Sequence, residues 1–163
     1  NLLGEANEFT DFITAKQCDS GGCGGDFDHQ KSALILKWSD EKTARAQFGF
    51  GGMDLTDFSV ISFRISSRNE GWNNVRELHD AWLIVQDMDG DEASVLLSEI
   101  QRISHGYDSG HDTDILQTVR VNLSTLSLEN SDFNLATVHS FALEFPGDGL
   151  RGSVYLSDLE FSQ

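Results

Sequence analysis

Short apolar runs, each bounded by Gly, Asp, Asn or Ser, recur along the whole of this 163-residue chain. Most are rich in β-branched or aromatic residues, and none keeps an apolar period of 3.6 residues. That pattern is typical of β-strands and not of helices. About eight strands with almost no helix predict an all-β chain, a β-sandwich jelly roll of two antiparallel sheets. The runs are SALILKW, AQFGFGG, FSVISFRIS, AWLIVQDMDGDEASVLLS (two strands around a turn), LQTVRVNLS, VHSFALEF and GSVYLSDLEF.

The length suits one domain with a real hydrophobic core. The sequence contains no internal repeat, linker or low-complexity tract, and its 15 Gly residues supply the turns. We therefore expect a single β-sandwich domain over residues 1–163.

The charge of the chain is strongly acidic, with 27 Asp and Glu against 11 Lys and Arg and a formal net charge of −16. Nucleic acids and anionic membranes need clustered positive charge, so neither is an expected partner. No stretch approaches the roughly 20 apolar residues of a membrane helix, and no signal peptide is visible. The acidity suits a secreted protein, and self-repulsion favours a monomer.

The two cysteines, Cys18 and Cys23, enclose four residues in CDSGGC, two of which are Gly. This spacing can close a small loop, and a Cys18–Cys23 disulfide would place the chain in an oxidising compartment. Two free thiols in a loop are the alternative.

The period-two phase of several strands separates an apolar face from a polar one. In VISFRIS, the side chain of Arg64 points to the face opposite the apolar residues of the same strand. In TVRVNL, the side chains of Arg120 and Asn122 do the same. A polar face of this kind, with Trp82 on a neighbouring strand, is what a sugar-binding surface needs. Sugar rings stack on aromatics and their hydroxyls pair with planar polar groups. An ordinary solvated sheet face is the alternative.

Three motifs that suggest other chemistry are better explained as loops. The DSGG sequence within CDSGGC comes too early in the chain for a chymotrypsin-like nucleophile. DMDGDE lacks the spacing of an EF-hand, and Gly90 after Asp89 favours a hairpin turn. HGYDSGHDTD carries His105 and His111 without a strand pattern, so we expect a surface loop, with a metal site as the alternative.

The last strand, GSVYLSDLEF, breaks its own alternation. Val154 and Leu156 set one phase, whereas Leu159 and Phe161 belong to the other. Asp158 lies at the break, which indicates either a β-bulge or turn, or a carboxylate placed there to bind something.

Taken together, NLLGEANEFTDF, ALILKWS, DLTDFSVISFRIS, LIVQDMDG, LQTVRVNLSTLS, NLATVHSFALEF and GSVYLSDLEF resemble the jelly-roll carbohydrate-binding modules of the galactose-binding-like group. The resemblance spans nearly the whole chain, although each motif is loose. It implies a non-catalytic module attached to a catalytic domain of a secreted bacterial protein, with a polysaccharide or oligosaccharide as ligand.

The resemblance also implies a structural calcium ion. In these modules an Asp of the final strand commonly binds Ca²⁺ together with an acidic residue of the first strand, and Asp158 matches that Asp. Glu8 is the expected partner, with Glu5 as the alternative, although Glu8-Phe9 reverses the family's usual order. Asp28 is the candidate for a third ligand. Ca²⁺ takes six to eight oxygen ligands, and such a site would tie both ends of the chain together.

The resemblance places the glycan on a concave sheet or at the loops. The residues whose phase or position fits such a site are Arg64, Trp72, Trp82, Gln86, Arg120 and Asn122. In AWLIVQ both phases are apolar, so the sequence leaves open whether Trp82 faces ligand or core.

Two other functions stay open from the sequence. The shortage of aromatic residues, with only three Trp and two Tyr, is compatible with a protein-binding accessory domain of a secreted protease or surface protein. A small lyase or hydrolase is the second open function, because a sequence does not show whether two carboxylates lie close together in the folded chain.

Overall fold

The structure is a computed structural model that describes residues 7–10, 12–18, 33–38, 43–67, 80–103, 116–147 and 151–163. For residues 7–10, 12–18 and 127–129 it describes the backbone alone. The strands are β1 (Asn7–Thr10), β2 (Phe12–Cys18), β3 (Ala33–Trp38), β4 (Ala44–Met53), β5 (Val60–Ser67), β6 (Trp82–Asp87), β7 (Glu92–Leu96), β8 (Gln117–Asn122), β9 (Val138–Phe145) and β10 (Gly152–Ser162).

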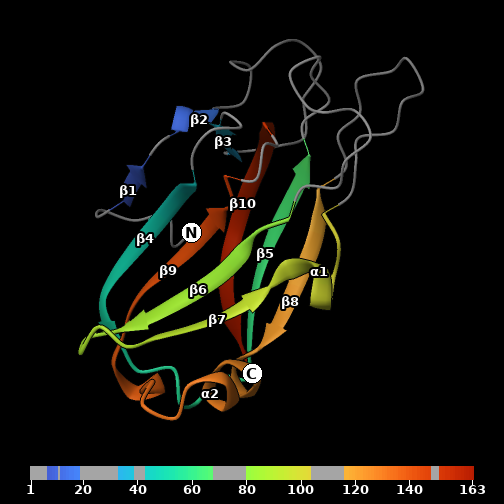
Figure 1. Ribbon diagram of the computed structural model, residues 1–163. Coiled ribbons are helices and arrows are strands. Elements are labelled where there is room, and N and C mark those ends of the chain that lie inside the picture. Colours follow the sequence, from blue (N-terminus) through green and yellow to red (C-terminus); the bar gives the residue numbers. More distant parts are fainter. Residues whose placement is uncertain are drawn as a thin grey trace.

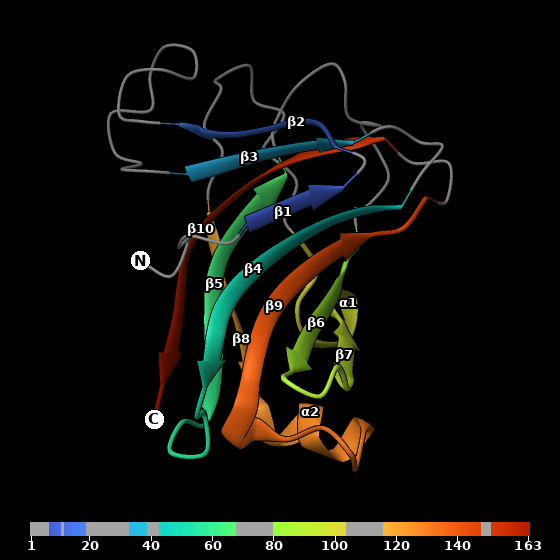
Figure 2. The same cartoon turned by 90° about the vertical axis from the view of Figure 1, so that its left-hand side faces the viewer.

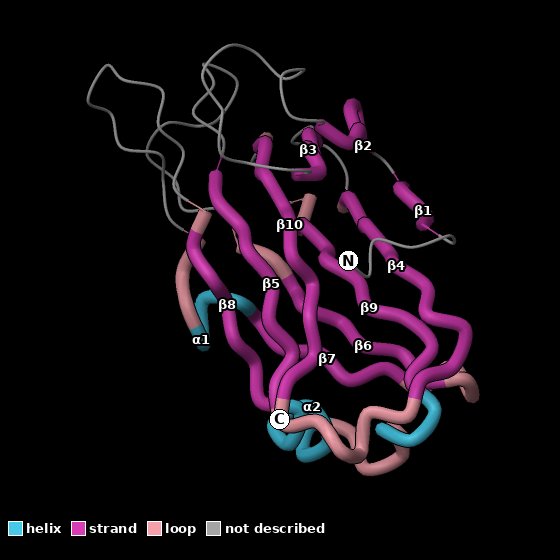
Figure 3. The backbone as a smooth tube through the Cα atoms, turned by 180° about the vertical axis from the view of Figure 1, so that it is seen from behind, coloured by secondary structure: helices cyan, strands magenta, loops and turns pink. Residues whose placement is uncertain are grey.

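These strands form two five-stranded sheets. Sheet A has the order β1-β4-β9-β6-β7 and sheet B the order β2-β3-β10-β5-β8, with antiparallel pairing throughout. Strands β6 and β7 of sheet A lie in front in Figure 1, and β10, β5 and β8 of sheet B come to the front when the molecule is seen from behind in Figure 3. The predicted β-sandwich jelly roll is confirmed.

Aromatic side chains join the two sheets across the core. Trp38 of sheet B stacks on Phe145 of sheet A with ring centroids 4.2 Å apart, and Phe63 of sheet B meets Phe141 of sheet A edge-on at 5.6 Å. Each buried aromatic side chain removes a large apolar area from water, and paired rings add about 0.5–1.5 kcal/mol beyond that area. The inward residues predicted from the strand phases are all buried: Ile61, Phe63, Ile65, Val119, Val121, Leu123, Phe141, Leu143 and Phe145.

Short helical segments occur at three places in the described residues: α1 (Leu97–Ile100), α2 (Leu123–Glu129) and the 3₁₀ turn η1 (Leu135–Thr137). Asn134 caps η1, because its side-chain oxygen accepts the backbone N–H of Ala136 at 3.0 Å. The sequence predicted almost no helix, and α2 was not expected. Figure 3 shows α2 at the end of the sandwich where the C-terminus lies. Within the described part of the chain, no helix is long and apolar enough to cross a membrane.

The alternation break in β10 is a β-bulge. Ser157 pairs with Arg64 and Glu160 with Ser62, so β10 spans three positions where β5 spans two. The extra residue lets both Leu156 and Leu159 face the core, where they are 1% and 2% exposed. Asp158 itself is exposed and has a φ of 54°, in the left-handed region that Asp tolerates better than most residues.

Candidate functional site

The outer face of sheet A gathers polar side chains from four neighbouring strands, and we call it the sheet A face. Strand register arranges its residues in three rows that cross β4, β9, β6 and β7 in that order. Figure 2 shows β4 and β9 bending along their length, so the sheet is curved and not flat. The rows are Arg45-Glu144-Trp82-Leu96, Gln47-Ala142-Ile84-Ser94 and Gly49-Ser140-Gln86-Glu92.

A network of hydrogen bonds and ion pairs covers the sheet A face. The guanidinium of Arg45 contacts the carboxylate of Glu92 at 2.7 Å and that of Glu144 at 3.7 Å. Gln86 donates to the same Glu92 oxygen at 3.4 Å. Gln47 donates to the hydroxyl of Ser140 at 2.9 Å. The face therefore presents planar amide, carboxylate and guanidinium groups, which are suited to pairing with hydroxyl groups.

Beneath this network lies a floor of buried side chains. Ile84, Ala142 and Ser140 point away from the sandwich core by their register, yet they are only 6%, 1% and 1% exposed. Ile84 and Ala142 also lie outside the inner core cluster. The polar layer above them therefore shields a small apolar surface on the outside of sheet A.

Trp82 occupies the first row of the sheet A face, between Glu144 on β9 and Leu96 on β7. Its side chain is 40% exposed, whereas the next residue, Leu83, is fully buried. This answers the question that the sequence left open: Trp82 faces outward. It is also the one strongly exposed aromatic side chain among residues 33–38, 43–67, 80–103, 116–147 and 151–163. A partly exposed indole is a stacking surface for a ligand ring.

Sequence reasoning identified Trp82 and Gln86 as ligand residues and assigned Glu144 to a polar sheet face, but it missed Arg45, Gln47 and Glu92. The signal was present in ARAQFGF, where Arg45 and Gln47 alternate with the buried Ala44, Ala46 and Phe48.

The remaining predicted residues of the polar face lie on the opposite side of the molecule. Arg64 on β5 and Arg120 and Asn122 on β8 are exposed residues of sheet B. The expectation that Trp82 sits on a strand beside them is wrong, because β6 belongs to sheet A. Strand phase distinguishes inside from outside, but it does not assign a strand to a sheet.

Asp158 forms an ion pair with Arg64, whose Nη1 lies 3.3 Å from Asp158 Oδ2. The Ser157 hydroxyl donates to the same carboxylate oxygen at 3.1 Å. Among the described residues, no group of three or more His, Cys, Asp or Glu side chains is placed to hold a metal ion. The described surroundings of Asp158 thus supply a cation and one hydroxyl, which do not by themselves fit a Ca²⁺ shell of six to eight oxygens.

Several predicted residues lie outside what the structure describes. Glu8 is placed by its backbone opposite Gln47, in sheet A, whereas Asp158 belongs to sheet B. The side chains of Glu8 and Cys18 are not described, nor are residues Cys23, Asp28 and Trp72. His105 and His111 also fall outside the described ranges. The disulfide and the two further calcium ligands therefore stay predictions.

A hairpin turn and not a metal loop joins β6 to β7, as the sequence favoured. Gly90 has a φ of 91°, which a residue without a side chain adopts at no steric cost. Asp87 is buried at the base of this turn, and its Oδ1 accepts the backbone N–H groups of Asp89 and Asp91 at 3.0 and 2.9 Å. Burial acts to raise the pKa of Asp87, but the backbone donors outweigh it and hold that pKa below the ordinary value.

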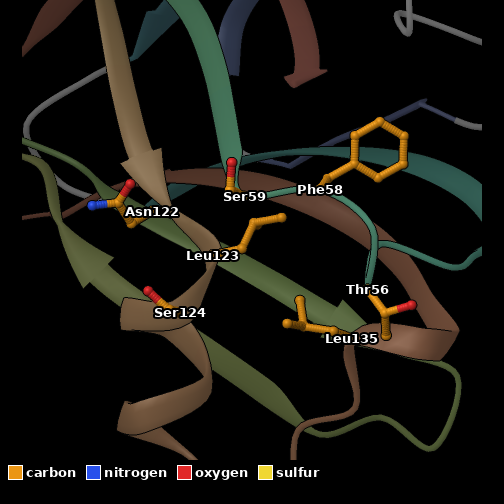
Figure 4. A pocket seen from close by; sticks show the side chains of 7 residues that line it. All are labelled: Thr56, Phe58, Ser59, Asn122, Leu123, Ser124 and Leu135. Carbon is orange, nitrogen blue, oxygen red and sulfur yellow. The ribbon is translucent and has the colours of Figure 1, made fainter. Parts of the chain in front are cut away.

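A hollow of about 540 Å³ lies at the end of the sandwich where β8 meets α2 (Figure 4). Its apolar residues are Phe58, Leu123 and Leu135, and hydroxyl or amide groups complete its lining. Asn122, a predicted ligand residue, contributes to this hollow and not to the sheet A face. The polar lining residues are Thr56, Ser59, Asn122 and Ser124.

Solved structures of carbohydrate-binding modules share this fold. The family 11 module from Clostridium thermocellum, in complex with a β-1,3-1,4-mixed-linked tetrasaccharide, matches with a TM-score of 0.62 and 10% identity over 98% of this chain and 85% of its own. The family 30 module of a Clostridium thermocellum cellulosomal cellulase matches with a TM-score of 0.62 and 14% identity over 91% of each chain. An exo-β-agarase gives a TM-score of 0.68 at 12% identity, over 99% of this chain and 24% of the agarase.

No protein-family model and no curated protein matches this sequence. At these low identities the likeness to solved structures shows the fold alone, and it confirms the carbohydrate-binding-module-like jelly roll that the sequence resembles.

Proposed function

We propose that this chain is a non-catalytic carbohydrate-binding module and that the sheet A face binds the glycan. The observation that carries the proposal is the position of Trp82, 40% exposed in a face whose other groups are amides, carboxylates and a guanidinium. An indole supplies the stacking surface for a sugar ring, and the neighbouring polar groups suit its hydroxyls. The mixed-linked tetrasaccharide bound by the family 11 module supports a glycan as the ligand class.

Affinity electrophoresis tests this proposal. The chain is run through gels containing mixed-linked β-1,3-1,4-glucan, agarose-derived polysaccharide or no glycan. We expect at least one glycan to retard the wild type, and Trp82→Ala to lose roughly fivefold or more of that affinity, since stacking on one aromatic side chain contributes about 1–3 kcal/mol.

Arg120→Ala is the matched control, because Arg120 is exposed on the outer face of sheet B. It should bind like the wild type. Loss of binding in Arg120→Ala with retention in Trp82→Ala would move the site to the other face, and failure of every glycan to retard the wild type would refute the proposal.

A protein-binding accessory domain is the second candidate function. The single strongly exposed aromatic side chain in the described residues supports it, because glycan-binding faces gain affinity from several stacking rings. Binding to denatured protein in a pull-down, without binding to any glycan, would favour this function.

We further propose that the module works outside the cell, as a monomer, joined to a catalytic domain in a longer chain. The cellulase that carries the family 30 module and the agarase that exceeds this chain in length support that arrangement. Extending the gene sequence beyond both ends tests for a leader and an enzyme domain. Light scattering tests the monomer, which has a mass of 18.0 kDa.

We also keep the calcium ion held by Glu8, Asp28 and Asp158 as a proposal. Its support is the resemblance of the last strand to modules that bind Ca²⁺ there. The Arg64–Asp158 ion pair opposes it, because a guanidinium beside the carboxylate competes with a cation.

A further inference from the structure

We infer that Arg45 and Glu92 form a strap across the sheet A face, which a glycan must displace to reach the floor of Ile84 and Ala142. The inference rests on the proposed function, because it names the two residues that decide which ligands the face admits.

The geometry of the strap follows from strand register. Arg45 lies on β4 in the first row and Glu92 on β7 in the third, so the two residues occupy opposite corners of the face. Three strand spacings, about 14 Å, separate their strands in the sheet. Their side chains nevertheless meet at 2.7 Å. The two side chains must therefore reach toward each other over the residues between them, on a face that curves inward.

The residues under this line are the buried floor. Ala142 and Ile84 occupy the middle row on β9 and β6, between the two corners. Both face outward and both are almost completely shielded, at 1% and 6% exposure. In its row Ala142 lies between the larger side chains of Gln47 and Ile84, and the strap crosses the same position, so these groups together keep Ala142 from solvent.

The closed strap is weakly held. The side chains of Arg45 and Glu92 are 25% and 38% exposed, and ion pairs with this much solvent contact contribute little and are screened by salt. In addition, Arg45 Nε is buried without a hydrogen-bond acceptor in the part of the chain that the structure describes. Opening the strap frees that donor for contact with ligand hydroxyls.

Opening also changes what the face offers to a ligand. A closed face presents Trp82 beside charged groups, whereas an open face adds apolar contact from Ile84 and Ala142. A glycan that fills this surface must work against the ion pair. For an uncharged ligand, the salt dependence of binding then reports on the strap.

The first test measures the affinity for mixed-linked β-1,3-1,4-glucan tetrasaccharide by calorimetry, at 20 mM and 500 mM NaCl. We expect the wild-type affinity to rise roughly two- to fivefold with salt, the range that corresponds to a partly exposed ion pair. Glu92→Gln keeps the shape of the side chain and removes its charge. At low salt it should approach the affinity that the wild type reaches at high salt, and most of the salt response should be lost, since only the longer Arg45–Glu144 contact of 3.7 Å remains.

Glu160→Gln is the matched control, because it makes the same change of charge at an exposed position of β10, in the other sheet. It should leave both the affinity and its salt response as in the wild type. Weaker binding by Glu92→Gln, or an unchanged salt response, would overturn the inference, because Glu92 would then contact the ligand directly or have no part in binding.

The second test needs no glycan and separates the strap from the proposed function. Ala142→Cys introduces a thiol under the strap, and its alkylation rate is measured on the peptide that contains position 142. We expect Glu92→Gln to accelerate this labelling roughly two- to fivefold and Glu160→Gln to leave it unchanged. Ile84→Cys replaces Ala142→Cys if the latter does not fold. Unaccelerated labelling refutes the strap even if glycan binds, whereas accelerated labelling supports it even if no glycan is found.

Discussion

The carboxylate of Asp87 accepts the backbone N–H of Asn134 at 2.9 Å, although 47 positions separate the two residues. The other carboxylate oxygen holds the turn between β6 and β7 by accepting two backbone N–H groups. One buried side chain thus connects the hairpin to the segment before β9. Both strands of that hairpin carry the sheet A face, so Asp87 fixes the end of the face where Gln86 and Glu92 lie.

Replacing Asp87 by Asn should destabilise the fold. An amide NH₂ in place of one oxygen faces a backbone donor, and the negative charge that strengthens the other hydrogen bonds is lost. We expect the free energy of unfolding to fall by roughly 2–4 kcal/mol, since hydrogen bonds to a charged acceptor contribute about 1.5–3 kcal/mol each. Urea denaturation followed by tryptophan fluorescence measures the change.

Asp89→Asn is the control for that prediction, because it makes the same chemical change two positions away at an exposed site of the same turn. It should shift the stability by less than about 0.5 kcal/mol. Equal effects at both positions would show that the burial and hydrogen bonds of Asp87 do not stabilise the turn.

The same carboxylate predicts a pH dependence of stability. Burial raises the pKa of Asp87, but its backbone donors outweigh burial and lower that pKa from the ordinary 3.8. A group with a lowered folded-state pKa stabilises the fold fully above its unfolded value, and this contribution is lost as the pH falls through the folded value.

The difference in unfolding free energy between wild type and Asp87→Asn should therefore be constant near neutral pH and shrink below about pH 4. Hydrogen bonds from Thr56 also lower the pKa of Asp54, but that residue is common to both proteins, so its effect cancels. A difference that grows on acidification would contradict the assignment.

The sequence predicted the hairpin at DMDGDE because Gly90 follows Asp89, a local signal. It did not distinguish Asp87 from the other acidic residues of the motif. The burial of Asp87 depends on Asn134, far away in the chain, and only the packing of β9 beside β6 brings the two together. Local turn chemistry is readable from neighbouring residues, whereas a long-range hydrogen bond is not.

A different limit applies to Trp82. Its orientation was ambiguous because both phases of AWLIVQ are apolar, and the structure shows why: Ile84 is an outward residue kept from water beneath the polar side chains of its own face. Strand phases correctly predicted the inner core. They did not separate the two outer faces, so Arg64 and Arg120 were grouped with a tryptophan that belongs to the other sheet.

The bulge at Asp158 makes a prediction about backbone conformation. With φ at 54°, this position suits Gly and tolerates Asp, whereas a β-branched residue is strained there. Asp158→Gly should change the stability by less than about 0.5 kcal/mol, and Asp158→Val should cost roughly 1–2 kcal/mol. Thermal unfolding in EDTA, where no metal ion contributes, compares the two variants.

Glu160→Val controls for the loss of an exposed acidic residue, since Glu160 lies in the same strand beyond the bulge and has no positive φ. Val should be tolerated there because strands favour β-branched residues. Equal stability of Asp158→Val and Asp158→Gly would contradict the left-handed backbone conformation at position 158.

The calcium proposal has the sharpest single measurement, the unfolding midpoint in 2 mM CaCl₂ against the midpoint in EDTA. A ligand that binds only the folded state at about 100 times its dissociation constant stabilises by about 2.7 kcal/mol. For a chain of this length that corresponds to a rise of roughly 5–10 °C.

Asp158→Asn should lose the response to Ca²⁺, because the amide keeps the bulge but lacks the charge. Arg64→Gln breaks the same ion pair while keeping the carboxylate, so it should retain the response in full or increase it. If the wild type gives equal midpoints in both buffers, Asp158 has no metal to bind, and its place in the last strand follows from the bulge and from Arg64 alone.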